Sequence, residues 1–289
     1  MMNEKMVRAN GVDLCVETFG DPSDPGILLI GGAASSMDWW EEEFCERLAA
    51  GPRFVIRYDL RDTGRSVSYP PGAPGYTQPD LVADALGLLD VLGLARAHLV
   101  GISMGGGMAQ RIGVEHPERA ASLTLISTSP GGPGGPSNPD LPPISEKLLA
   151  VFSEPSPDPD WSDREQVIEY VVDGQRPFAA TSAAFDEERM RRIATQVVDR
   201  SSNIESSMKN HWILKGGEPV RSRLGSVTAP TLVLHGTEDP LFPYGHAVAL
   251  ANEIPGARLI PLEQTGHEMP PPAVWDVVVP AILAHTEAR

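Results

Sequence analysis

One serine stands between small residues, in the segment Gly101-Ile102-Ser103-Met104-Gly105. The pattern G-x-S-x-G is typical of a sharp turn that joins a strand to a helix and exposes the serine hydroxyl. An apolar run that ends at Val100 precedes this turn, and a helical pattern over residues 104–115 follows it. In this context we expect Ser103 to be a nucleophile rather than an incidental serine in a glycine-rich turn.

A serine hydroxyl is a weak nucleophile near neutral pH and needs a base that an acid holds in place. Of the seven histidines, only His267 follows a late predicted strand in a glycine-containing turn. The sites of α/β sheets lie in such turns at strand carboxyl ends, so His267 is the expected base. The other six are expected in strands (His98, His235), at the surface (His116, His285), at a helix start (His246) and in a helical insertion (His211).

The expected acid lies in the loop that follows the apolar run 231–234, where Glu238 and Asp239 offer two carboxylates. Asp239 is favoured because a residue before proline is held extended, which directs its side chain toward the imidazole. Glu238 is then expected to face solvent, and it remains the alternative acid. With Asp239, the chain order is Ser, Asp, His, which is one of the known orders of this triad.

Six short apolar runs, each bounded by turn residues, alternate with helical patterns along the chain. Continuous apolar character suits strands that are buried on both faces, as in a parallel sheet. A helix is indicated by apolar positions over residues 81–92, with a capping box at 77–80 and Gly93 after it. We therefore predict an α/β fold with a mostly parallel sheet. The runs are 26–31, 54–58, 97–101, 123–126, 231–235 and 258–261.

Residues 127–229 break this alternation. They open with a glycine- and proline-rich loop at 129–136 and continue with helical patterns, clearest at 163–173 and 186–200. We predict a core of residues 1–126 and 230–289 with a helical cap, residues 127–229, inserted between two core strands. Most aromatic residues of the insertion are expected to pack within it, and two or three to line an apolar pocket together with Gly32. The candidates for this lining are Trp161, Phe178, Phe185 and Trp212.

Several charged residues near these segments are expected to be structural rather than chemical. Asp59 and Arg61 are expected to hold loops together by an ion pair or a helix cap. Arg189, Arg191 and Arg192 cluster on one predicted helix, and we expect them to form a solvated face.

Composition limits the classes of partner. The chain has 289 residues, 39 of them acidic and 23 basic, with a formal net charge of −16. Nucleic acids and anionic membranes require basic side chains, so neither is an expected partner. No apolar run reaches the roughly 20 residues that span a bilayer, and no secretory signal is found. Cys15 and Cys45 lie in apolar settings and are expected to be buried free thiols, which suits a cytoplasmic protein.

No metal-ligand spacing and no dinucleotide-binding motif stands out, so no metal and no cofactor are expected. The expected partner is a small-molecule ester substrate.

Together these motifs resemble the α/β-hydrolase superfamily along nearly the whole chain. Beyond the serine turn, the resemblance rests on Ile30-Gly31-Gly32-Ala33, on the loop 58–66, on Asp239-Pro240 and on Gly266-His267. It implies an eight-stranded, mostly parallel sheet flanked by helices, with a helical cap after strand six. Residues 31–33 align with the family's His-Gly-X, and this alignment implies that the N–H groups of Ala33 and Met104 form the oxyanion hole.

Two positions depart from the family pattern. Gly31 replaces a histidine that commonly braces the oxyanion loop, and Asp62 replaces a glycine of the second loop. Both departures resemble the anthracycline methyl esterases (aclacinomycin methylesterase type). That resemblance implies cleavage of the methyl ester of a bulky aromatic, polyketide-type substrate.

The serine at the turn disfavours the dehalogenases and epoxide hydrolases of this fold, which carry a carboxylate there. We expect a serine hydrolase that cleaves a carboxylic ester through an acyl-enzyme intermediate. C–C hydrolase, lactonase, thioesterase and perhydrolase chemistry stays open, and so does cofactor-free lyase or oxygenase chemistry on the same residues. A ligand-binding receptor built on a hydrolase scaffold is the third class.

Overall fold

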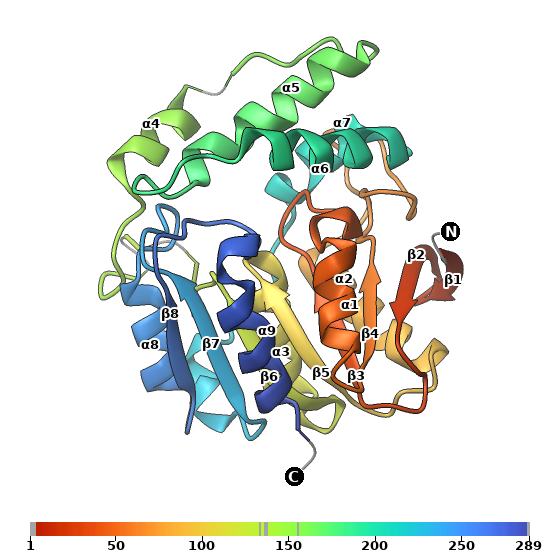
Figure 1. The fold of residues 1–289 in the computed structure, drawn as a ribbon, viewed down its shortest axis with the longest axis vertical. Coiled ribbons are helices and arrows are strands. Elements are labelled where there is room, and N and C mark those ends of the chain that lie inside the picture. Colours follow the sequence, from red (N-terminus) through yellow and green to blue (C-terminus); the bar gives the residue numbers. More distant parts are fainter. Residues whose placement is uncertain (1–3, 133, 136–137, 155, 288–289) are drawn as a thin grey trace.

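The computed structural model describes residues 4–132, 134–135, 138–154 and 156–287. Its centre is an eight-stranded sheet with the order β1-β2-β4-β3-β5-β6-β7-β8 (Figure 1). The pairs β1–β2 and β2–β4 are antiparallel, and the other five pairs are parallel. This confirms the predicted fold class. The strands are β1 Lys5–Ala9, β2 Val12–Phe19, β3 Gly26–Ile30, β4 Phe54–Tyr58, β5 Ala97–Ile102, β6 Ala120–Ile126, β7 Thr231–Gly236 and β8 Arg258–Leu262.

The first two strands were not indicated by the apolar runs, because β1 is largely exposed and β2 is buried only in its middle. The hairpin between them turns at Asn10 and Gly11, whose φ angles are 47° and 77°. An Asn-Gly pair with two positive φ angles is the turn that matches the twist of a two-stranded hairpin. That dipeptide was the signal in the sequence for the antiparallel edge.

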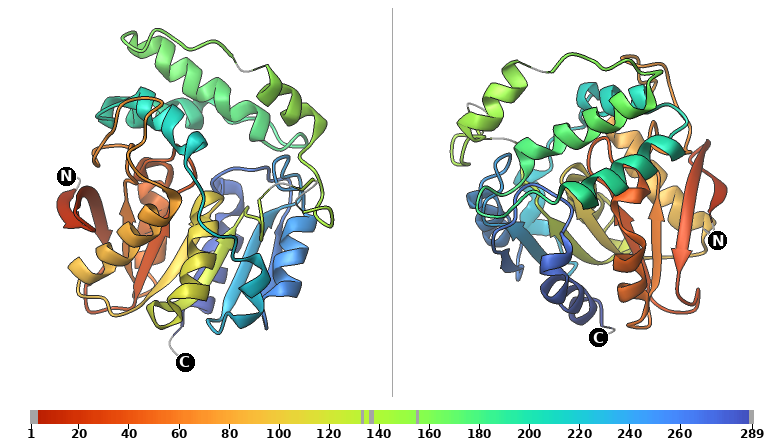
Figure 2. Two further views of the ribbon diagram at one scale, coloured as in Figure 1. Left: turned by 180° about the vertical axis from the view of Figure 1, so that it is seen from behind. Right: turned by 45° about the horizontal axis from the view of Figure 1, so that its top comes forward.

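Helices cover both faces of the sheet and form two apolar cores with it (Figures 1 and 2). One core contains side chains of α2 (Gln78–Val91), α3 (Met104–Glu115) and α8 (Gly245–Glu253). The other contains side chains of α1 (Glu42–Ala49) and α9 (Trp275–His285). The helix predicted over 81–92 is α2. It begins at the expected capping box, in which the Thr77 N–H donates to the Asp80 carboxylate at 2.8 Å.

The described residues between β6 and β7, here called the cap, contain several helices, and those between residues 146 and 213 lie over the carboxyl ends of the parallel strands (Figures 1 and 2). Apolar side chains of α5 and α6 join the core that α1 and α9 form on the sheet. Pro133 and Pro136 of the predicted loop lie outside the described residues. The cap helices are α4 Glu146–Ser153, α5 Arg164–Gln175, α6 Glu187–Arg200 and α7 Ile204–Lys209, with the short 3-10 helices η3 Arg176–Phe178, η4 Asn210–Ile213 and η5 Arg221–Ser226.

A buried cluster of charges fixes α6 to the core. The Arg200 side chain, only 5% exposed, donates to Glu4 at 2.6 Å and to Asp38 at 2.6 Å, and it also binds Asp59. Burial raises the pKa of Asp59, although Arg200 acts in the opposite direction. Removal of the guanidinium would therefore leave acidic groups buried without a counter-charge.

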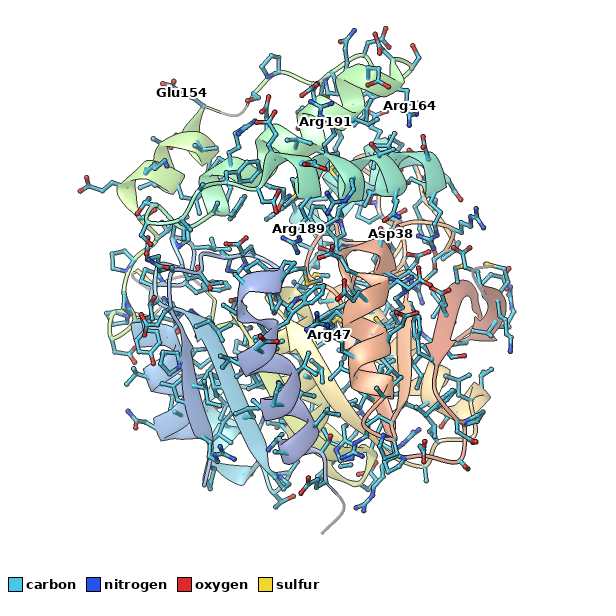
Figure 3. The ribbon with its side chains drawn as sticks, viewed as in Figure 1. Asp38, Arg47, Glu154, Arg164, Arg189 and Arg191 are labelled. Carbon is cyan, nitrogen blue, oxygen red and sulfur yellow. The ribbon has the colours of Figure 1, made fainter. Side chains whose placement is uncertain are left out.

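The prediction of a solvated arginine face on α6 is wrong for Arg189. Its guanidinium is buried and donates to the Glu41 carboxylate at 2.8 Å, whereas Arg191 pairs with Glu169 of α5. Figure 3 shows the two arginines on opposite sides of α6, with Arg189 toward the core. Arg191 and Arg192, whose side chains are 40% and 61% exposed, have the expected surface position.

Other structural expectations are confirmed. The Arg61 guanidinium forms a two-point ion pair with Asp84 at 2.6 and 2.7 Å, and Asp59 binds loop N–H groups as well as Arg200. Cys15 and Cys45 are buried free thiols, and burial raises the pKa of each to about 12. Within the described residues, no helix has the length and apolar character that crossing a bilayer requires.

Replacement of Arg200 by methionine is expected to lower the free energy of unfolding by about 3–5 kcal/mol, because it strips buried carboxylates of their counter-charge. Urea unfolding followed by circular dichroism measures this. Arg192→Met is the matched control, and its exposed pair with Glu188 should be worth no more than about 0.5 kcal/mol. Equal effects of the two variants would contradict the assignment of Arg200 as the anchor of the cap.

Candidate active site

Ser103 occupies a strained turn between β5 and α3. Its backbone has φ 52° and ψ −118°, a conformation that L residues rarely adopt. The turn leaves no room for side chains on either side, because a Cβ at Gly101 would lie 2.2 Å from the Gly105 oxygen. A Cβ at Gly105 would lie 2.3 Å from the Ile30 oxygen. The glycines of the motif are therefore required by packing, and they let the serine hydroxyl stand at the amino end of α3.

The three residues predicted from the sequence to act together are hydrogen-bonded in a chain. His267 Nε2 lies 3.0 Å from Ser103 Oγ, and His267 Nδ1 lies 2.8 Å from Asp239 Oδ2. Each residue follows a different strand, Ser103 after β5, Asp239 after β7 and His267 after β8. Because β5, β7 and β8 are parallel members of one sheet, their carboxyl ends bring these loops to one edge.

The surroundings of Asp239 keep it ionised. Burial opposes the charge, but His267 and the backbone N–H groups around the carboxylate hold the pKa of Asp239 below its ordinary value. The N–H groups of Leu241 and Phe242 donate to Oδ1 at 2.9 and 2.8 Å, which leaves Oδ2 for the imidazole. A fixed carboxylate on Nδ1–H directs the basic lone pair of His267 to Ser103.

Glu238 is partly exposed, as expected, but its carboxylate also binds the cap. Its carboxylate accepts hydrogen bonds from the N–H and hydroxyl of Thr181, both at 2.9 Å, and from the Ser182 N–H at 3.0 Å. Bonds from Ser182 and Thr181 lower the pKa of Glu238 to about 2. Glu238 therefore binds a cap loop rather than His267.

The loop after β3 lies against the serine. A Cβ at Gly32 would be 3.4 Å from the Ser103 Cβ, so the backbone of the loop passes directly beside Ser103. In the part of the chain that the structure describes, no acceptor binds the N–H of Ala33 or of Met104, the first residue of α3. The two N–H groups named as oxyanion-hole donors are thus free to bind a substrate oxygen.

Aromatic rings run from His267 to the molecular surface. The rings of Phe242 and Phe178 lie 5.3 and 5.9 Å from the imidazole. Phe152 of α4 lies 6.1 Å from Phe178 and 6.4 Å from Trp212, and Phe152 and Trp212 are 45% and 56% exposed. Sequence reasoning named Phe178 and Trp212 but missed Phe152 and Phe242, which no local pattern separates from core residues.

The other two cap aromatics of the predicted pocket lie elsewhere. Trp161 packs on Tyr170 with a ring separation of 5.5 Å, and Lys209 covers its face. Phe185 lines a cavity of about 540 Å³ whose lining includes neither Ser103 nor His267. The structure does not bring Trp161 or Phe185 together with the three hydrogen-bonded residues.

The remaining histidines have structural contacts. His98 binds the Ser122 hydroxyl at 2.8 Å, His235 donates to the Phe242 carbonyl at 2.7 Å, and His246 binds the Ser129 hydroxyl at 2.9 Å. His116 is partly exposed as expected, whereas His285 is half-buried and bonds to the Leu123 carbonyl. Among the described residues, no cluster of three or more His, Cys, Asp or Glu is arranged to hold a metal ion.

A hydroxyl on a strained strand–helix turn, with a histidine and an aspartate from later strands, defines the α/β hydrolases. The sequence profile of the alpha/beta hydrolase fold family matches residues 25–271, and the chain belongs to this family.

Among curated relatives, rhodomycin D methylesterase DauP of Streptomyces sp. (strain C5) is 34% identical over 99% of this chain and 99% of its own length. The expected resemblance to anthracycline methyl esterases and the expected class of ester hydrolase are thereby confirmed. A 2-hydroxy-6-oxo-6-phenylhexa-2,4-dienoate hydrolase of Comamonas testosteroni is 31% identical over 68% of each chain. An esterase from Exiguobacterium antarcticum shares the fold with a TM-score of 0.76 at 22% identity, covering 98% of this chain and 99% of that one.

The two neighbouring carboxylates are expected to differ sharply when each is changed to its amide. Asp239→Asn should slow labelling of Ser103 by a fluorophosphonate about 10³–10⁴-fold, because the amide no longer fixes the imidazole tautomer. Glu238→Gln should label within about 3-fold of the parent rate, since the Glu238 carboxylate binds Thr181 and Ser182 of the cap rather than His267. The measurement is the labelling rate with both proteins checked for folding, and a reversed order would reassign the acid.

Proposed function

We propose that the chain is a serine esterase in which Ser103, His267 and Asp239 form the catalytic triad. Ser103 Oγ attacks the ester carbonyl carbon while His267 Nε2 takes its proton, and Asp239 stabilises the resulting imidazolium. His267 then gives this proton to the departing alkoxide. The alcohol dissociates, and the acyl group remains bonded to Ser103 as an acyl-enzyme. Water, deprotonated by the same imidazole, releases the acid and restores the serine. The observation that carries this proposal is the hydrogen-bonded chain Ser103–His267–Asp239.

The N–H groups of Ala33 and Met104 bind the negatively charged oxygen of the tetrahedral intermediate. Both are unoccupied by protein acceptors among the described residues, and the amino end of α3 adds its partial positive charge at Met104. Loss of a single donor of this kind costs about 2.7–4 kcal/mol of transition-state stabilisation in other hydrolases.

The substrate that the surroundings of the triad favour is a methyl ester on a bulky aromatic acid. Phe242 and Phe178 flank His267, and Phe152 and Trp212 continue the aromatic surface outward. A planar polycyclic acyl group would stack on these rings while its small ester group reaches Ser103. The full-length similarity to a rhodomycin D methylesterase supports the same substrate class. We propose Gly32 as part of this lining, because its backbone lies against Ser103.

We further propose that the described part of residues 127–229 acts as a cap on a core of residues 1–126 and 230–289, and that a small-molecule ester is the partner. The two free, buried cysteines support a cytoplasmic location, where thiols remain reduced.

Ser103→Ala is expected to abolish hydrolysis of methyl esters of aromatic polyketide acids, which the parent protein cleaves with release of methanol. The reason is that, among the described residues, Ser103 supplies the one hydroxyl that binds His267 Nε2. The assay follows methanol and free acid by chromatography, with aryl acetates of different size run beside the methyl esters. A parent protein that cleaves no ester faster than Ser103→Ala would refute the esterase proposal.

Two cap tryptophans offer a matched test of the aromatic surface. Trp212→Ala should raise KM for a polycyclic aromatic methyl ester roughly 2–10-fold, through the loss of one aromatic contact, and leave KM for methyl acetate unchanged. Trp161→Ala should leave both values unchanged, because Trp161 packs on Tyr170 away from the triad. Equal effects of the two variants on KM would contradict the proposal that Trp212 contacts an aromatic substrate.

A second candidate function is hydrolysis of a C–C bond beside a ketone, because a dienoate hydrolase is 31% identical over two thirds of the chain. Turnover of a 2-hydroxy-6-oxo-dienoate faster than of any methyl ester, with loss in Ser103→Ala, would favour this reaction over ester cleavage.

A further inference from the structure

The loop that carries the Ala33 N–H makes a strained turn. The Ser35 N–H donates to the Gly32 carbonyl at 3.3 Å, so residues 32–35 reverse the chain direction. The third residue of this turn, Ala34, has a φ angle of 59°. That left-handed conformation is favourable for glycine but unfavourable for alanine. Something outside the turn must therefore hold it, because the local sequence alone favours another backbone.

A histidine from the cap binds this turn. His211 of η4 is 4% exposed, and its Nδ1 accepts a hydrogen bond from the Ala34 N–H at 2.9 Å. Its Nε2 lies 2.8 Å from the Arg61 carbonyl oxygen. A carbonyl only accepts, so Nε2 carries the proton and Nδ1 presents a lone pair. The ring is thus in the one neutral tautomer that satisfies both partners.

Burial favours the same neutral ring, since it lowers the pKa of His211. A protonated ring would turn Nδ1 into a donor that faces the Ala34 N–H. The contact therefore acts only through an uncharged imidazole, which is the state that burial maintains.

The residue before His211 fixes its position. Asn210 is fully buried; its amide nitrogen donates to Asp62 at 2.9 Å and its amide oxygen accepts from the Gly72 N–H at 2.7 Å. Asp62 in turn accepts from the Tyr76 hydroxyl at 2.6 Å and adopts a φ of 66°. The pair Asn210–His211 therefore connects the loop of Asp62 to the turn beside Ser103.

We infer that His211 is a positioning residue for the reaction: it holds the turn 32–35 so that the Ala33 N–H faces the oxygen of the tetrahedral intermediate. The inference rests on the proposed esterase function. His211 touches neither substrate nor Ser103 and acts through the Ala34 peptide. Gly31 has no side chain with which to hold the loop. His211 holds the loop instead, from the cap.

Three substitutions and a control test the inference on hydrolysis of an aryl acetate. His211→Ala removes both contacts. His211→Asn keeps an acceptor oxygen near the position of Nδ1, and His211→Gln keeps a donor near the position of Nε2. The control His98→Asn alters a histidine whose bond to Ser122 joins β5 to β6 away from the turn.

His211→Ala is expected to lower kcat about 10–100-fold with KM within about twofold, less than the about 10²–10³-fold loss of a complete oxyanion donor. Binding of an aryl trifluoromethyl ketone, whose adduct with Ser103 carries an oxyanion, should weaken by a similar factor. His211→Asn should restore most of kcat, and His211→Gln should not. His98→Asn should leave kcat and ketone affinity unchanged even where it lowers the melting temperature.

A structural role alone predicts that activity follows melting temperature across all four variants, and that outcome would overturn the inference. So would unchanged ketone affinity in His211→Ala, or equal kcat in His211→Asn and His211→Gln. Should His211→Ala not fold, the comparison of the asparagine and glutamine variants still decides. Ser103→Ala separates the two proposals: activity that survives it refutes the esterase, whereas Ser103-dependent activity that is indifferent to residue 211 refutes only this inference.

Discussion

The backbone conformation at Ser103 is the constraint on which the site depends. A positive φ at a residue with a Cβ is unfavourable in isolation and persists only where surrounding packing fixes it. Here β5 and α3 are both packed in the core, and the backbone at Gly101 and Gly105 is so close to its neighbours that neither position has room for a Cβ. The turn places the hydroxyl above the sheet and the Met104 N–H beside it. The proposed nucleophile and one proposed oxyanion donor are therefore positioned by the same short stretch of backbone.

The cap is bound by hydrogen bonds to the loops that carry the proposed triad. The His267 N–H donates to the Phe178 carbonyl at 2.8 Å, and Glu238, next to Asp239, binds the cap loop at Thr181. On the opposite side, Arg200 anchors α6 through buried ion pairs.

The sequence alone was sufficient for the parts of the site that local pattern determines. Ser103 follows an apolar strand in a glycine-rich turn, and His267 and Asp239 each follow a later strand, so one sheet edge gathers all three. Contacts between segments far apart in the chain leave no such local pattern in the sequence, so they could not be predicted. Arg189 reads as one of a solvated cluster until Glu41, 148 residues away along the chain, is seen to bind it. Phe152 likewise reads as an ordinary apolar residue of a helix.

The two departures from the family pattern, Gly31 and Asp62, can be explained by the same part of the cap. A loop without a histidine at position 31 lacks internal support, and an aspartate at position 62 introduces a buried carboxylate that requires donors. The adjacent cap residues Asn210 and His211 meet both needs, since one binds Asp62 and the other binds the turn at Ala34. With both loops bound to η4, the geometry of the proposed oxyanion hole depends on the position of the cap.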